Sequence, residues 1–237
     1  MSTASLSSAS ILTDIITAPA RAFASIKEQP SVWLPLTIVL VSYCAVSIVY
    51  TSSVDFAWLI DQQLQQAQNL TDAQREQAVK AALRISPAVY GVIGAVAASI
   101  FIPALFALTS LYYTGVSFVT GDGVKYKQWF ALACWCAIPI VLGLVAALVH
   151  VLAGDARFMR QEELNPFSFG NLLGVDRAGA TILHRILLGL DVTAIWSVVL
   201  SIVGYQSFTK RSLAFSAAIV LAPLALIIAI SAAIALR

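Results

Sequence analysis

The order of hydrophobic and polar positions divides this chain into long apolar runs with polar stretches between them. A run of about 20 apolar residues is the length of helix that crosses the roughly 30 Å hydrocarbon core of a bilayer. The pattern therefore predicts an all-α fold, a polytopic membrane helix bundle with five transmembrane helices in one domain over residues 31–237. The five predicted spans are about 32–52, 88–112, 129–153, 183–206 and 213–236.

The N-terminal segment, residues 1–30, has a different pattern. Its apolar residues recur at roughly helical spacing, with charged residues between them: Ile11, Ile15, Ile16, Phe23 and Ile26. Pro19 suits the first turn of a second helix. We therefore expect two short N-terminal amphipathic helices that lie along the membrane surface. A loosely ordered tail is the alternative.

Two longer polar stretches, 53–87 and 154–181, are predicted to form loops on the outer face. The first has helical propensity but is too polar to span a bilayer. Thr71 followed by Gln74 matches a capping box, so we expect a fresh helix there and a small helical hairpin in water. The second is broken by glycines and a proline, and its phenylalanines indicate partial burial against the bundle.

The composition supports this picture and excludes some partners. Only 11% of the residues are charged and 59% are hydrophobic, whereas a soluble domain has about 25% charged residues. The lipid bilayer is therefore the predicted surrounding. A net charge of +2 is too small to indicate nucleic acid as a partner. Cys134 and Cys136 point in different directions on a helix, so packing is favoured over metal binding.

Small residues recur at four-residue spacing in the second span, at Gly91, Ala95 and Ser99. Such rows let helix backbones approach closely. They are compatible with contacts inside the bundle, with a homo-oligomer or with other membrane proteins as partners. Pro139, near the middle of the third span, is expected to kink that helix and to free a backbone carbonyl group.

Asp191 is the most conspicuous polar residue, because its neighbours in the sequence are Leu190 and Val192. If the fourth span begins near residue 183, this carboxyl group lies about two turns inside the helix. A charge within a bilayer is costly, so the group must be protonated, pair with a base, or face a wet cavity. Thr193 and Ser197 continue a small, polar face beside it. His184 and Arg185 are the nearby candidate bases, and His150, at the outer end of the third span, could also approach.

Several interpretations of Asp191 remain open. The carboxyl group and its polar row could hold the bundle together, line a solute or proton pathway, or contact a partner protein. A metal site formed with His150 and His184 is a weaker alternative, because no ligand-spacing motif supports it. The chain contains no phosphate-binding glycine loop, nucleophile elbow or HExxH motif. We therefore predict no enzyme, no catalytic residue and no cofactor.

The short connections give the orientation. The connections 113–128 and 207–212 hold a single acidic residue, Asp122, and four basic residues: Lys125, Lys127, Lys210 and Arg211. Positive charge in short loops favours the cytoplasmic side. We therefore predict a multi-pass protein with a cytoplasmic N-terminus and a C-terminus on the outer face.

Three stretches resemble bacterial Yip1-domain proteins. They are TAPARAFASIKEQPSVWLPL at 17–36, GVKYKQWFALACWCAIPIVLG at 123–143 and LLGLDVTAIWSVVLSIVGY at 187–205. The resemblance covers most of the chain, apart from the loops at 53–87 and 154–181. It implies a five-span helical bundle in the bacterial inner (plasma) membrane. The positions it marks as family positions are Gly123, Tyr126, Pro139, Asp191 and Trp196.

The resemblance leaves two functional readings. Eukaryotic relatives are linked to Rab GTPases and vesicle traffic, but their acidic Tyr-Gly-Pro motif before the first span is absent here, which argues against GTPase binding. The first reading is a non-enzymatic membrane protein that organises the membrane or partner proteins through its helical bundle. The second is a transporter, channel or lipid-moving protein that uses a polar cleft around Asp191.

Overall fold

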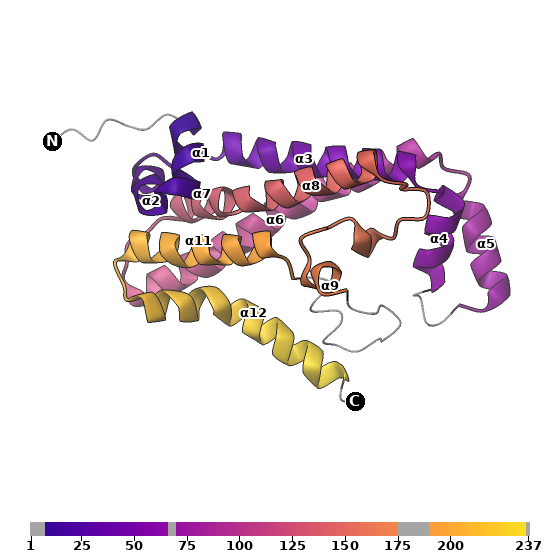
Figure 1. Cartoon of the computed structure of the whole chain (residues 1–237). Coiled ribbons are helices and arrows are strands. Elements are labelled where there is room, and N and C mark those ends of the chain that lie inside the picture. The colour runs from indigo at the N-terminus through magenta and orange to yellow at the C-terminus, as the bar shows by residue number, and fades with distance from the viewer. Residues whose placement is uncertain (1–7, 66–69, 175–189, 236–237) are drawn as a thin grey trace.

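The computed structural model describes residues 8–65, 70–174 and 190–235, and these form an all-helical bundle (Figure 1). The elements in chain order are α1 (Ser8–Thr17), α2 (Pro19–Glu28), α3 (Trp33–Ser53), α4 (Phe56–Gln65), α5 (Asp72–Ala82), α6 (Pro87–Thr120), α7 (Tyr126–Cys136), α8 (Ile138–Ala153), the 3₁₀ turn η1 (Gln161–Glu163), α9 (Phe169–Leu172), α11 (Val192–Thr209) and α12 (Leu213–Ala235).

Five helical segments are long and apolar enough to cross a membrane: α3, α6, α7 with α8, α11 and α12. This confirms the predicted fold class. Two boundaries differ from the prediction. Helix α6 has 34 residues and continues to Thr120, because apolar residues extend past 112 until Gly121 ends the helix in a left-handed conformation with φ 71°. Helix α11 begins at Val192 rather than near 183.

Helix α3 packs against both α6 and α8. The small-residue row of α6 makes the close contact with α3. The hydroxyl of Ser47 donates a 3.0 Å hydrogen bond to the carbonyl of Gly91, and Cys44 lies beside Ala95 and Ser99. The small-residue row predicted from the sequence therefore makes a contact between two helices of the same chain, α6 and α3.

The third span is divided at Ala137, two residues before Pro139. Pro139 lies in the first turn of α8, where its missing N–H group costs no hydrogen bond. Hydrogen bonds over three residues, from Ala137 N to Cys134 O and from Ile140 N to Ala137 O, connect the two helices. The helix expected to be irregular at Pro139 is thus interrupted, and the interruption lies at Ala137, before Ile138 and Pro139.

The N-terminal helices α1 and α2 pack into the bundle. Ile11, Ile15, Phe23 and Ile26 are buried in the main core cluster, together with residues of α7 and α11. Gln128 Nε2 donates a 2.8 Å hydrogen bond to the carbonyl of Lys27, which ties α2 to α7. Protein side chains therefore cover the apolar faces of both helices. That the two helices lie along the membrane surface stays a prediction.

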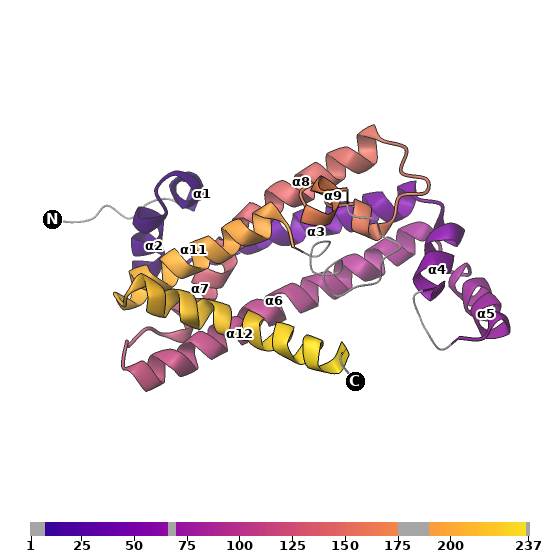
Figure 2. The same cartoon turned by 60° about the horizontal axis from the view of Figure 1, so that its bottom comes forward.

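The polar stretch 53–87 forms the predicted helical hairpin, α4 and α5. Thr71 and Gln74 make the capping box at the start of α5. Arg75 joins the two helices through a 2.6 Å ion pair with Asp61. The hairpin lies at the opposite end of the bundle from α1 and α2 (Figure 2).

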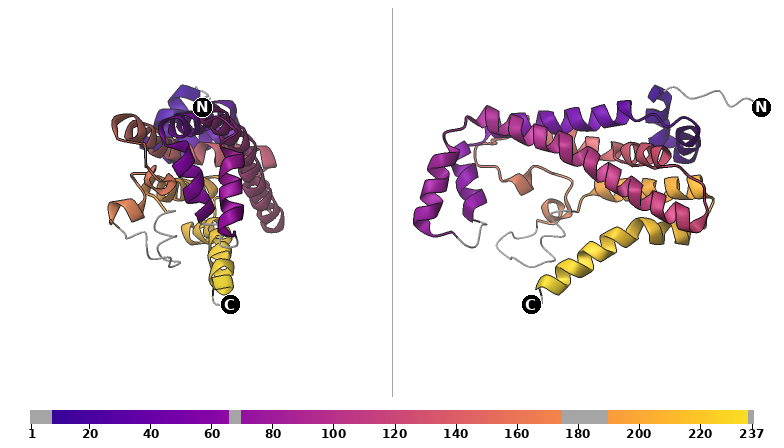
Figure 3. Two further views of the ribbon diagram at one scale, coloured as in Figure 1. Left: turned by 90° about the vertical axis from the view of Figure 1, so that its right-hand side faces the viewer. Right: turned by 180° about the vertical axis from the view of Figure 1, so that it is seen from behind.

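The two short connections lie at the same end as the N-terminal helices, as predicted. Arg211 Nε donates a 2.8 Å hydrogen bond to Asp122 Oδ1 and so joins the α11–α12 connection to the α6–α7 connection. From this end α12 runs along α11 and then diverges from the bundle (Figure 3). Helix α12 therefore begins at the end of the bundle that carries α1 and α2, and its C-terminal part points away from that end.

Candidate functional site

Asp191 is the N-cap of α11 and does not lie within the helix. Its Oδ1 accepts hydrogen bonds from the backbone N–H of Ala194 at 2.7 Å and from the hydroxyl of Thr193 at 2.5 Å. The predicted position two turns inside a span is therefore wrong. Aspartate is among the best N-cap residues because its side chain satisfies a free N–H group of the first turn, and its negative charge favours the helix N-terminus.

The same carboxylate holds the preceding loop. Asn165 Nδ2 donates a 2.7 Å hydrogen bond to Asp191 Oδ2. Ser168 and Asp191 form an isolated antiparallel bridge, in which Phe169 N donates to Leu190 O and Val192 N donates to Phe167 O. The segment after α8 therefore folds back onto the first turn of α11, which agrees with the expected partial burial of this loop.

This junction lies well inside the length of the bundle. A Cβ atom added at Gly143 would be 3.2 Å from the Thr193 hydroxyl, so the first turn of α11 touches the middle of the third span. Gly143 is ten residues before the end of α8, which corresponds to about 15 Å at 1.5 Å per residue. Non-helical backbone at such a depth is tolerated where protein buries it or where it lines a wet cavity.

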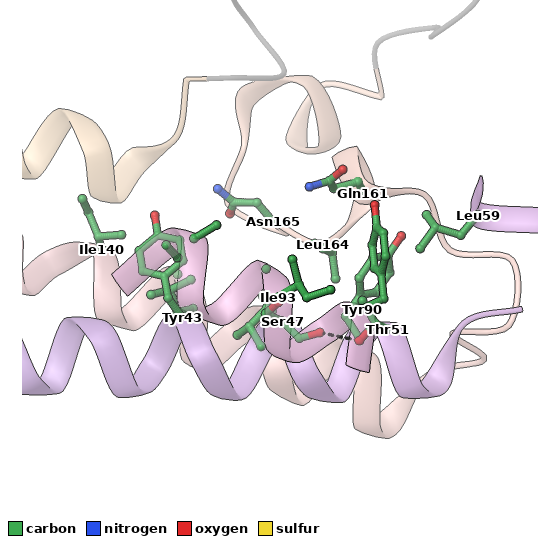
Figure 4. Close-up of a pocket in the computed structure, with 18 of the residues that line it drawn as sticks. Tyr43, Ser47, Thr51, Leu59, Tyr90, Ile93, Ile140, Gln161, Leu164 and Asn165 are labelled. Carbon is green, nitrogen blue, oxygen red and sulfur yellow. Dashed lines mark hydrogen bonds between the residues drawn. The ribbon is translucent and has the colours of Figure 1, made fainter. Parts of the chain in front are cut away.

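A cavity of about 570 Å³ lies beside the junction (Figure 4). It runs along α3 from Tyr43, near Asn165 and Ile140, to Thr51, Tyr90 and Leu59. The described residues that line it are Tyr43, Val46, Ser47, Tyr50, Thr51, Leu59, Gln63, Tyr90, Ile93, Gly94, Ala97, Ala98, Ile140, Gly143, Leu144, Ala147, Gln161, Leu164, Asn165, Asp191 and Thr193. Pockets of this size commonly bind small molecules.

The polar groups that line the cavity come mainly from α3 and from the folded-back loop. Tyr43, Ser47 and Thr51 are spaced four residues apart and therefore share one face of α3. Sequence reasoning overlooked this row, although its spacing was a readable signal. Asn165 and Gln161 were not predictable, because their approach depends on the path of an irregular loop.

The predicted site residues divide into three groups. Asp191 and Thr193 line the cavity, and Ser197 lies one turn further on, where its hydroxyl bonds to the carbonyl of Thr193 at 3.0 Å. His150 is exposed and does not line the cavity, about two turns beyond Gly143 toward the end of α8. His184 lies outside the described residues, so the structure does not place it.

The family positions predicted from the resemblance do not form a single site. Pro139 is buried at the start of α8, and Trp196 packs on the main core cluster. Gly123, with φ 69°, and Tyr126, which stacks on Phe130, lie at the connection between α6 and α7. These four positions therefore shape the bundle and the turn between α6 and α7, whereas Asp191 lines the cavity.

The cavity has the chemistry of a binding site. Among the described residues, no group of three His, Cys, Asp or Glu side chains is placed to hold a metal ion. Asp191 is the single carboxylate in the lining, and the other polar groups there are hydroxyls and side-chain amides. Such a lining can hold and orient a molecule by hydrogen bonds and charge.

The Yip1 domain family matches residues 13–234, which is nearly the whole chain. The chain belongs to the Yip1 domain family. Membership agrees with the resemblance and with the five helices that can span a membrane. The match includes α1 from Thr13 onward and α2, so the N-terminal helices packed in the core lie within the region that matches the family.

This Yip1-domain protein is also similar to a bacterial protein, "Membrane protein YknW" of Bacillus subtilis (strain 168). The two are 27% identical over 194 residues, which cover 80% of this chain and 74% of the relative. No solved structure matches the chain. The family and this relative therefore establish a membrane protein.

Proposed function

We propose that this Yip1-domain protein is a non-enzymatic membrane protein that organises other membrane proteins by helix–helix contact, chiefly through α12. The observation that carries the proposal is the divergence of this helix from the bundle. From Leu224 to Ile230 every residue of α12 is exposed in the single chain. Near its start the helix is held by α11 and by the hydroxyl of Tyr112, which donates a 3.0 Å hydrogen bond to Ile219 O.

The exposed helix carries a face suited to close packing. Four exposed alanines, at positions 218, 222, 225 and 229, follow one another at spacings of four, three and four residues. This is the spacing of a coiled-coil seam. In a bilayer, small residues on a seam let two helices approach and pack by van der Waals contact. The occupant that fits is a transmembrane helix of a partner protein.

The seam can be tested by adding bulk on one face at a time. We expect Ala225→Phe to reduce cross-linking to partner helices in native membranes by several fold, because the ring prevents close approach. Ile227→Phe adds bulk about 200° around the helix and is the matched control. The proposal fails if the wild-type protein gives no cross-linked product and remains a monomer. It also fails if the two variants reduce cross-linking equally.

We propose the bacterial inner membrane as the location, with the N-terminus in the cytoplasm. The supporting observation is the cluster of short basic connections at the end of the bundle that carries α1 and α2. Lys125, Lys127 and Lys210 are exposed there, and positive charge near the ends of spans is retained on the cytoplasmic side.

The second candidate function is a transporter, channel or lipid-moving protein that uses the cavity beside Asp191. A mainly apolar cavity with several polar groups, Asp191 among them, is the specific observation that favours it. Reconstituted liposomes would show movement of a solute, protons or a fluorescent lipid, and Asp191→Asn would change that movement. Asp122→Asn, a carboxamide substitution at the other end of the bundle, is the control. Absence of movement for every cargo would contradict this candidate.

A further inference from the structure

We propose that the cavity is a binding site for an amphiphile whose head is an ammonium group and whose tail is an alkyl chain, with Asp191 as the recognition group. The inference rests on the cavity that motivates the second candidate function. It is independent of partner binding by α12. It concerns binding alone, so it holds whether or not the ligand is moved.

The charge of the cavity selects a cation. Among the described lining residues there is one carboxylate, Asp191, and there is no lysine, arginine or histidine. The neutral donors around Asp191 come from the chain itself, and none of them cancels its charge. Among the described lining residues an anionic head would therefore meet this carboxylate without a compensating base, which is costly away from water.

The carboxylate retains capacity for a ligand. Oδ1 accepts two hydrogen bonds, from Thr193 and Ala194, whereas Oδ2 accepts one, from Asn165. A carboxylate has about four acceptor sites. An ammonium N–H can therefore bond to Oδ2 without displacing the N-cap or the loop contact. A hydrogen bond between two ionised groups is about twice as strong as a neutral one.

Aromatic and hydroxyl groups complete the site for the head. Tyr43 lines the same end of the cavity, and its hydroxyl points toward the side where Asn165 lies (Figure 4). A tyrosine ring attracts a cation that lies over its face. At the far end, the hydroxyl of Tyr90 is already bonded to Gln63 at 3.0 Å. The end at Asp191 is therefore the end that binds charge.

The remaining wall suits an alkyl chain and opens toward lipid. Ile93, Gly94 and Ala97 of α6 line the cavity and are exposed. They lie six to ten residues into α6, about 9–15 Å from its start, within its apolar part. A tail can therefore rest against α6 while the head reaches Asp191 from the side.

Two sources can supply this chemistry, namely a bilayer lipid such as phosphatidylethanolamine and a free alkylammonium molecule. The test is native mass spectrometry of the purified full chain with dodecylammonium, phosphatidylethanolamine and phosphatidylglycerol. We expect dodecylammonium to bind the wild type and to bind Asp191→Asn at least about tenfold more weakly. Asn is also a good N-cap, so this variant keeps the start of α11.

Two further variants serve as controls, and the comparison of the two ammonium probes identifies the source of the ligand. Asp122→Asn controls for loss of a carboxylate elsewhere, and Ala97→Phe fills the tail region without touching Asp191. We expect binding to survive the first substitution and to be lost with the second. Binding of phosphatidylethanolamine as well identifies a bilayer lipid as the source, and binding of dodecylammonium alone identifies a free amphiphile.

The inference is overturned if neither ammonium probe binds, if phosphatidylglycerol binds equally well, or if Asp191→Asn binds like the wild type. Its failure can be told apart from failure of the functional candidates. Binding without movement in liposomes contradicts the transporter candidate but leaves the site intact, and cross-linking through α12 is measured separately.

Discussion

At the scale of single residues, Asp191 shows how a carboxylate is accommodated in an apolar sequence. The residue does not need a basic partner, because the backbone N–H of Ala194, the hydroxyl of Thr193 and the amide of Asn165 all donate to it. Its charge also lies at the positive end of the α11 dipole. A structural role and a role in the cavity are therefore compatible. The one carboxylate caps α11, bonds to Asn165 of the preceding loop and lines the cavity.

Substitutions of Asp191 separate these roles. We expect Asp191→Ala to lower the free energy of unfolding by about 1–2 kcal/mol or more, since it loses both the cap and the Asn165 contact. Asp191→Asn keeps the cap and should cost less. Thermal unfolding of the detergent-purified variants measures the difference. Equal destabilisation by Asn and Ala would show that capping is not what the side chain contributes.

At the scale of elements, α3 packs closely on α6. A Cβ atom at Gly91 would be 2.3 Å from the hydroxyl of Thr51 and 3.1 Å from the Cα of Ile48. The second neighbour is backbone, so the clash cannot be relieved by rotating a side chain. Gly115, further along the same helix, has open space around it.

This contrast gives a paired prediction for α6. We expect Gly91→Ala to destabilise the bundle by about 1–3 kcal/mol, because the two helices must separate. Gly115→Ala should cost nothing measurable. The midpoint of unfolding in denaturant reports both, and a Gly91→Ala variant as stable as Gly115→Ala would mean that the helices do not approach this closely.

The elements also show what sequence can predict here. Span number, the capping box at Thr71 and the small row at Gly91 were predictable, because each depends on local spacing. The burial of α1 and α2 was not, since an amphipathic face looks the same whether lipid or protein covers it. The start of α11 was missed because a run of leucines and isoleucines before Asp191 resembles the beginning of a span.

The candidate site was predictable only in part, for the same reason. Asp191 and Thr193 stood out as polar residues among apolar ones, and the row at Tyr43, Ser47 and Thr51 carried a helical spacing that could have been read. Asn165 reaches the site through an irregular loop whose path depends on tertiary hydrogen bonds. Long-range contacts of that kind leave no periodic trace in a sequence.

At the scale of the whole molecule, the account depends on five crossings. If all five helices cross the membrane, the odd number puts the N-terminal helices and the end of α12 on opposite sides. The same count then puts the hairpin of α4 and α5, and the loop that carries Asn165, on the side opposite α1 and α2. The direction of approach to the cavity and the exposure of the α12 seam follow from this arrangement.

The most direct test is the membrane side of the two chain ends. Single cysteines introduced at Ser8 and after Arg237, in a chain whose native cysteines are replaced by serine or alanine, would be labelled with a membrane-impermeant maleimide in intact cells and in inverted vesicles. The account predicts that the residue after Arg237 is labelled in intact cells and that Ser8→Cys is labelled only in inverted vesicles. Labelling of both positions from the same side would contradict it.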